Sequence, residues 1–216
     1  MATGTVVIDP GHGGTGRVGD SDGNHAVSAS GVKEKDLTMI LANLVKSELQ
    51  TAAAAGGHSI NIFMTRTGDV NLGLADRAHV ARTHHADRFL SIHLNASDNG
   101  PARGTETYVR RAKDNVNLSA DKKFATKVQN AVFGAIRSFD PTTRDRGVKE
   151  AQFGVLNDVA LGNTAGGHCR AVLQEVEFLD NPRVDVLLNT GPNAAQVRTA
   201  IARAMAGAII DDLVNP

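Results

Sequence analysis

The chain has 216 residues, of which 41% are hydrophobic and 21% are charged, as in ordinary globular domains. Its 23 basic and 23 acidic side chains give a net charge of zero, which argues against nucleic acid as the main partner and against a polybasic membrane anchor. A single cysteine, Cys169, excludes an internal disulfide. We see no signal peptide and no apolar stretch of the roughly 18 residues that a membrane span needs. We expect one domain, residues 1–216.

Hydrophobic patterns then predict an alternation of strands and helices along the chain. Short apolar runs predict strands at 5–9, 60–64, 88–93, 105–109, 153–156 and 171–178. Helical spacing predicts helices that begin near residue 36 and end at the glycines 56–57, and further helices at 74–85, 118–139 and 194–214. This alternation predicts an α/β fold, a twisted and mostly parallel sheet with helices on both faces.

Three potential metal ligands stand near predicted strand and helix ends. His12 follows the first strand in a glycine-rich loop, Glu34 begins the first long helix, and His93 ends the third strand. Ligands of open α/β sheets bind beyond the carboxyl ends of the strands, so His12 and His93 are expected to converge. Two imidazoles and one carboxylate would leave a fourth position on zinc open for water. Taken singly, each residue has an ordinary structural explanation, such as a favourable Glu34 charge at a helix start.

A hydrolytic zinc site also needs a base that takes the proton of the attacking water. Two carboxylates in the last predicted strand, Glu175 and Glu177, are candidates. Strand alternation points both to the same face, so spacing alone does not choose between them.

The sequence around these residues resembles the N-acetylmuramoyl-L-alanine amidase family, zinc enzymes that cleave peptidoglycan. The matching blocks appear in the family's order and span nearly the whole chain, at 7–14, 34–37, 64–69, 86–96, 104–108, 146–149 and 172–181.

The resemblance implies one zinc ion held by His12, Glu34 and His93. It also selects Glu175 as the catalytic base, because the family's pattern Leu-x-Glu-x-x-Phe matches residues 173–178. The implied reaction is hydrolysis of the amide between N-acetylmuramic acid and the L-alanine of the peptidoglycan stem peptide. Such an enzyme would act in the periplasm or outside the cell, with peptidoglycan as its partner, and we expect a monomer. Arg66 and Arg77 are candidates for contacting a substrate carboxylate, or for structural ion pairs.

The chain departs from the family's pattern at three places. The loops 15–31 and 158–170 look longer than usual and are expected to shape access to the metal. Glu177 stands where the family has a small residue, and its charge would raise the pKa of Glu175 if the two carboxylates are close. For His25, His168 and Cys169 we favour solvated histidines and a buried cysteine over a second metal site or a nucleophile. The span 109–146 has room for one helix and its loops, so we predict an open site without an inhibitory plug.

Two other functions fit the same residues. One is a zinc carboxypeptidase or deacetylase on a related scaffold. The other is an inactive peptidoglycan-binding module, although a binding module needs no catalytic base.

Overall fold

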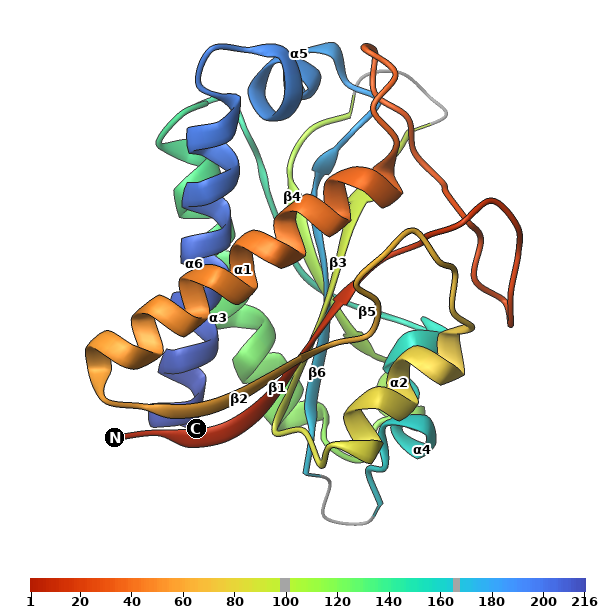
Figure 1. Cartoon of the computed structure of the whole chain (residues 1–216), viewed down its shortest axis with the longest axis vertical. Coiled ribbons are helices and arrows are strands. Elements are labelled where there is room, and N and C mark those ends of the chain that lie inside the picture. The colour runs from red at the N-terminus through yellow and green to blue at the C-terminus, as the bar shows by residue number, and fades with distance from the viewer. Residues whose placement is uncertain (98–101, 165–167) are drawn as a thin grey trace.

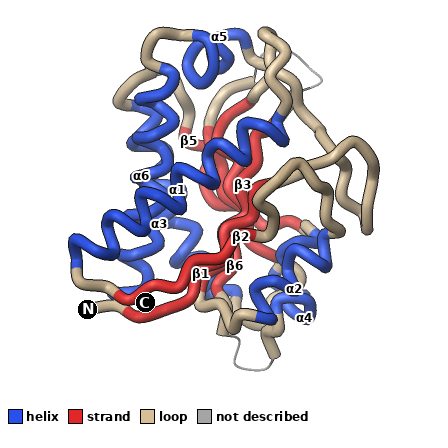
Figure 2. The backbone as a smooth tube through the Cα atoms, in the orientation of Figure 1, coloured by secondary structure: helices blue, strands red, loops and turns tan. Residues whose placement is uncertain are grey.

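The computed structural model describes residues 1–97, 102–164 and 168–216, and these residues contain one six-stranded sheet (Figures 1 and 2). The strands are β1 (Thr3–Pro10), β2 (Ser59–Met64), β3 (Arg88–Asn95), β4 (Thr105–Arg110), β5 (Asp145–Ala151) and β6 (Arg170–Phe178). Their order across the sheet is β2-β1-β3-β6-β4-β5. The first four strands in that order are parallel, whereas β4 pairs antiparallel with β6 and parallel with β5. The predicted mostly parallel sheet is confirmed.

Helices cover both faces of this sheet, as predicted. The helices are α1 (Glu34–Gly56), α2 (Leu74–Thr83), α3 (Leu118–Arg137), α4 (Asp158–Leu161), α5 (Pro182–Asp185) and α6 (Ala194–Val214), with short turns η1 (Ala112–Asp114), η2 (Gly154–Leu156) and η3 (Val186–Thr190). The long helices α1, α3 and α6 pack on one face, and α2, α4 and η2 pack on the other (Figure 1).

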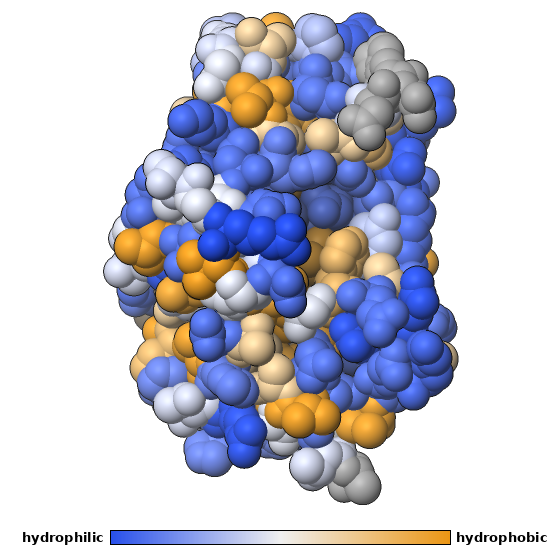
Figure 3. Space-filling model, turned by 90° about the vertical axis from the view of Figure 1, so that its right-hand side faces the viewer, coloured by the Kyte–Doolittle hydropathy of each residue, from blue (hydrophilic) through white to orange (hydrophobic). Residues whose placement is uncertain are grey.

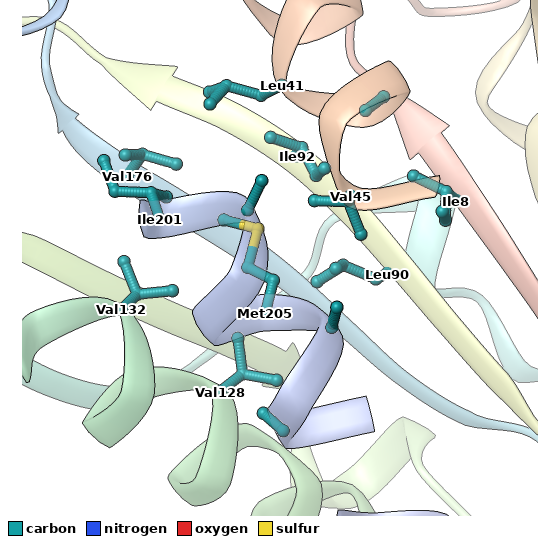
Figure 4. Close-up of a cluster of buried hydrophobic side chains, with 14 of the residues drawn as sticks. Ile8, Leu41, Val45, Leu90, Ile92, Val128, Val132, Val176, Ile201 and Met205 are labelled. Atoms are coloured by element: carbon teal, nitrogen blue, oxygen red, sulfur yellow. The ribbon is translucent and has the colours of Figure 1, made fainter. Parts of the chain in front are cut away.

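The strand alternation divides the core between these two faces. Ile8, Leu90 and Ile92 are fully buried against the long helices, where Leu41 of α1 and Met205 of α6 meet them (Figure 4). Val7, Phe89 and Leu173 lie in the second core, under α2 and η2. Strands buried on both faces read as continuous apolar runs, which explains why the central strands are visible in the sequence.

The predicted strand at 153–156 is wrong. The strand of this region is β5, and residues 154–156 form the turn η2. Val155 and Leu156 are apolar because they pack into the smaller core, and a side chain on Gly154 would collide with Leu74. The sequence of β5, Asp-Arg-Gly-Val-Lys-Glu-Ala, has no apolar alternation because β5 is an edge strand with half of its surroundings in water.

One face of the molecule shows the surface expected of a chain that buries most of its apolar residues in these two cores. Figure 3 shows mostly hydrophilic residues, with hydrophobic ones in separate small patches. Among the described residues, no helix has the length and hydropathy to cross a bilayer.

Candidate metal centre and active site

His12 is placed by the tight loop that follows β1. Its backbone has a φ of 59°, in the left-handed region, and the neighbouring Gly11 donates a hydrogen bond to the Ile92 carbonyl of β3 at 3.0 Å. A Cβ at Gly11 would lie 2.4 Å from the His93 ring, so only glycine lets the loop approach β3 this closely. His12 Nδ1 lies 2.9 Å from the Asp22 carbonyl oxygen. A carbonyl can only accept, so Nδ1 carries the proton and Nε2 keeps a free lone pair.

Glu34 is the first residue of α1 and its side chain is 1% exposed. Two backbone N–H groups fix the carboxylate: Leu94 donates to Oε1 at 3.0 Å, and Ala26 donates to Oε2 at 3.0 Å. The Leu94 bond connects the helix start to the end of β3, next to His93. The position of Glu34 is therefore determined by the backbone of two other segments.

The three predicted ligands converge on one point. His12 Nε2 lies 3.2 Å and His93 Nδ1 lies 3.1 Å from the same oxygen, Glu34 Oε1. One ligand atom from each residue falls within 4.8 Å of the others. Two imidazole nitrogens and a carboxylate oxygen at this separation form the donor set of an open zinc site. The residues present fit such an ion.

The electrostatics of the cluster favour a cation. Burial by itself would raise the pKa of Glu34, but its contacts with the His12 and His93 rings outweigh burial and hold the pKa well below the usual range. The carboxylate is therefore ionised at neutral pH. Burial lowers the pKa of His93, and the nearby His12 lowers it further. This favours the neutral imidazole, which is the form that binds metals.

Glu175 lies beside the cluster on the neighbouring strand, where it is the register partner of His93. Its Oε2 is buried and has no hydrogen-bond partner among the described residues. Burial raises the pKa of Glu175 well above its ordinary value, and the charges of Glu34 and Glu106 raise it further. A buried carboxyl group with a raised pKa and a free oxygen has the properties of a general base, because it holds a proton more tightly than an exposed carboxylate does.

Glu177 has a different environment, contrary to the expected shared face. Between the pairs His93–Glu175 and Asn95–Phe178, β6 has one residue more than β3, and this bulge breaks the alternation. Glu177 Oε2 accepts from the Gly104 N–H at 2.7 Å, and Oε1 accepts from Thr143 at 2.6 Å. The carboxylates that raise the pKa of Glu175 are Glu34 and Glu106, and not Glu177.

Sequence reasoning assigned no role to Glu106, which is 2% exposed and lies opposite Glu175 in the β4–β6 pair. Its Oε1 accepts from Asn95 Nδ2 at 2.7 Å and from the Tyr108 hydroxyl at 2.8 Å. Its Oε2 accepts from Arg146 Nε at 2.6 Å and also from Lys149 Nζ. The signal for this cluster was present in the matching blocks at 104–108 and 146–149, but the strand pairing that joins them was not readable.

Arg66 and Arg77 have structural partners. Arg77 is 1% exposed; its guanidinium donates to Asp9 Oδ1 at 2.9 Å and to the His12 carbonyl at 2.7 Å. Arg66 donates to the Pro10 carbonyl at 2.9 Å. Both arginines therefore hold the loop that carries His12.

His25, His168 and Cys169 do not form a second site. His25 is exposed and stacks on His12 with the ring centroids 6.4 Å apart. His168 pairs with Asp87 at 3.0 Å, far from the cluster in the fold, and burial raises the pKa of the Cys169 thiol. Among the described residues, His12, Glu34 and His93 form the one group that could hold a metal.

A cavity of about 320 Å³ contains the three ligands together with Glu175. Asp20, Ser21, Asp22 and His25 of the loop 15–31 line it, as expected for a loop that shapes access. No described residue of the span 109–146 lines it, so α3 does not block the cavity. The described part of the loop 158–170 does not reach the cavity either, while residues 165–167 lie outside the described residues.

Comparison with known proteins places the chain in the family that its sequence resembles. The family model for N-acetylmuramoyl-L-alanine amidase, Amidase_3, matches residues 6–207. The chain belongs to this family. It is 32% identical to the endolysin of Bacillus phage SPP1 over 85% of this chain and 58% of the endolysin. It is 28% identical to the N-acetylmuramoyl-L-alanine amidase AmiA of Escherichia coli (strain K12), over 91% of this chain and 73% of AmiA.

Solved structures of family members share the fold. The catalytic domain of CwlV, an N-acetylmuramoyl-L-alanine amidase from Bacillus (Paenibacillus) polymyxa var. colistinus, superposes with a TM-score of 0.76 at 28% identity, over 99% of both chains. An N-acetylmuramoyl-L-alanine amidase from Clostridium difficile 630 gives 0.74 at 28% identity, over 100% of this chain and 99% of that one. The chain covers 99% of both solved chains but 58% of the phage endolysin.

Proposed function

We propose that the chain is a zinc-dependent N-acetylmuramoyl-L-alanine amidase, which hydrolyses the amide between the lactyl group of N-acetylmuramic acid and L-alanine of the stem peptide. The observation that carries the proposal is the convergence of His12, Glu34 and His93 with the buried Glu175 in one cavity. Membership of the amidase family supports the choice of bond.

His12, Glu34 and His93 would hold the ion through Nε2, a carboxylate oxygen and Nδ1. Zinc bound there supplies a Lewis acid that polarises the substrate carbonyl and makes water a stronger acid at neutral pH. The chain's own contribution is to fix these ligands before substrate arrives. The Asp22 carbonyl sets the tautomer of His12, and the Leu94 N–H orients Glu34.

Glu175 would accept the proton of the attacking water and later deliver it to the departing amine of L-alanine. An amine is a poor leaving group until it is protonated, so the same carboxyl group must act first as base and then as acid. A pKa raised by burial and by Glu34 and Glu106 suits both roles, because a more basic carboxylate takes the proton of water more readily and still returns it to the amine.

The substrate places this activity in the periplasm or outside the cell, because peptidoglycan lies there. One zinc ion per chain and a monomeric state complete the proposal.

The decisive experiment is mass spectrometry of muropeptides after digestion of purified sacculi by the zinc-loaded protein, with and without a chelator. The proposed reaction frees peptides with an L-alanine amino terminus and leaves intact N-acetylmuramic acid. Release of acetate or of a single terminal amino acid would indicate a deacetylase or a carboxypeptidase instead. Binding of sacculi without any new product would indicate an inactive binding module.

A further inference from the structure

A second groove, outside the catalytic cavity, is lined by four arginines: Arg103, Arg144, Arg146 and Arg183. We call it the arginine groove. Its volume is about 600 Å³, and the rest of its lining is uncharged. The whole chain has a net charge of zero, so this concentration of one sign is a local feature. Clefts lined by one sign of charge attract ligands of the opposite sign.

Two of these arginines are already neutralised inside the protein. Arg103 Nη2 contacts Asp140 at 2.7 Å and Glu177 at 3.2 Å. Arg146 Nε contacts Glu106 at 2.6 Å. These contacts orient the two guanidinium groups and leave them in place at the wall of the groove.

The other two have no such partners. Arg144 and Arg183 are exposed, and neither side chain makes a hydrogen bond or an ion pair with any residue that the structure describes. A guanidinium group has five N–H donors in a planar fork, which matches a carboxylate or a phosphate. Arg144 and Arg183 therefore offer the groove's donors for an external anion.

One buried carboxylate joins the arginine groove to the catalytic cavity. Glu106 binds Arg146, which lines the groove, and also binds Asn95 and Tyr108, which line the cavity. The two sites therefore lie on either side of Glu106, and Glu106 is the register partner of Glu175. Arg183 of the groove belongs to α5, which follows the carboxyl end of β6 (Figure 1), and His93 of the metal cluster lies near the carboxyl end of the parallel strand β3. A substrate that extends from the reaction centre past β4 would reach the arginines.

We infer that the arginine groove binds free carboxylates of the stem peptide beyond its L-alanine and so selects acidic stems. This inference rests on the proposed amidase function. A carboxylate is favoured over an unconnected anion because the stem peptide is covalently attached to the bond held at Glu175, and binding of one part places the other. Arg144 and Arg183 supply the charge-assisted hydrogen bonds, and Arg103 and Arg146, already paired with carboxylates, form the fixed wall beside them.

The test compares two soluble N-acetylmuramyl tripeptides that differ only in the second and third residues, which carry either free carboxylates or carboxamides. We expect the wild type to prefer the carboxylate form. In the double variant Arg144→Gln, Arg183→Gln, the ratio of the two kcat/KM values should fall roughly tenfold, mainly through a higher KM for the carboxylate form. The matched control is Arg111→Gln, an exposed arginine outside the groove, which should leave the ratio unchanged.

Three outcomes would overturn the inference while leaving the amidase function intact. The first is equal cleavage of both tripeptides by the wild type, and the second is a loss of activity on both forms in the same proportion in the double variant. The third outcome is that the double variant keeps its substrate ratio but loses retention on sacculi that carry phosphate polymers, which would make the groove a phosphate-polymer site. Failure of the wild type to cleave either tripeptide would instead contradict the proposed function itself.

Discussion

Glu106 and Glu175 lie opposite each other on the antiparallel strands β4 and β6, so the proposed base has a second carboxylate as its register partner. Four side chains donate hydrogen bonds to Glu106: Asn95, Tyr108, Arg146 and Lys149. Burial opposes ionisation, but the bonds from Lys149, Arg146 and Tyr108 hold the pKa of Glu106 below the ordinary value. Glu106 is therefore ionised at neutral pH, and its charge raises the pKa of Glu175. The β4–β6 pair thus tunes the base.

This arrangement predicts the pH dependence of Glu106→Gln. A general base works when it is deprotonated, so kcat/KM falls as the pH drops through the pKa of Glu175. Glu106 raises that pKa, and its removal should move the acidic limb of the pH profile to lower pH. Without Glu106, the positive charges of Arg146 and Lys149 are no longer neutralised, and they also lower the pKa of Glu175.

The control for this measurement is Glu150→Gln on β5, whose carboxylate pairs with Lys122 at the surface. Its acidic limb should coincide with that of the wild type. An unchanged limb in Glu106→Gln would show that Glu106 does not set the pKa of the base, whereas a lower rate at every pH would indicate a purely structural role.

The second prediction concerns Glu175→Gln. The amide is close in size to the carboxyl group and cannot carry the proton, so turnover should fall by about 10²–10⁴-fold. Zinc content, measured on the purified variant, should stay the same because Glu175 is not a member of the ligand group. Wild-type turnover in this variant would contradict the proposed role, and loss of zinc would mean that Glu175 supports the metal.

Zinc should also stabilise the fold, because its ligands come from three separate segments that only the folded chain brings together. At a free zinc concentration about 100 times Kd, the free energy of unfolding should rise by about 2.7 kcal/mol. Urea denaturation with zinc or with a chelator measures the difference. His12→Ala should lose most of this increment, and an equal increment in the variant would place the zinc elsewhere.

The three proposed metal ligands each stand at a local signal in the sequence, and the resemblance to the amidase family then selected them as a set. His12 follows a β-branched run that ends in Pro-Gly, Glu34 begins an amphipathic helix, and His93 follows a continuous apolar strand. The carboxyl ends of parallel strands share one edge of a sheet, so the convergence of His12 and His93 followed from the fold class.

The role of Glu106 could not be predicted because it depends on pairing between strands that are distant in sequence. β4 contacts β6 across some 70 residues, and β4 runs antiparallel to the other central strands, which no local pattern indicates. The bulge in β6 that separates Glu175 from Glu177 is equally invisible in the alternation of residues 170–178. Edge strand β5 was missed because its residues are mostly polar.

The buried pair of Arg77 and Asp9 provides the last prediction. Both side chains are at most 2% exposed, and Nη1 of the arginine lies 2.9 Å from Oδ1 of the aspartate. Arg77→Met leaves Asp9 as a buried charge without its cationic partner, so the variant should lose about 3–5 kcal/mol of unfolding free energy. Urea denaturation measures this loss. The control Arg203→Met removes an exposed partner of Glu48 and should leave the urea midpoint close to that of the wild type.

A double variant tests whether this loss arises from the pair itself. In Asp9→Asn, Arg77→Met the buried negative charge is gone, so the combined destabilisation should be smaller than the sum of the two single effects. Arg77 also donates to the His12 carbonyl, and this bond is lost in either background. We therefore expect a lower zinc affinity both in Arg77→Met and in the double variant, even though the double variant recovers part of the lost stability. Strict additivity of the unfolding free energies would show that Asp9 and Arg77 act independently. Wild-type zinc affinity in the double variant would show that the loop of His12 is held by its other contacts.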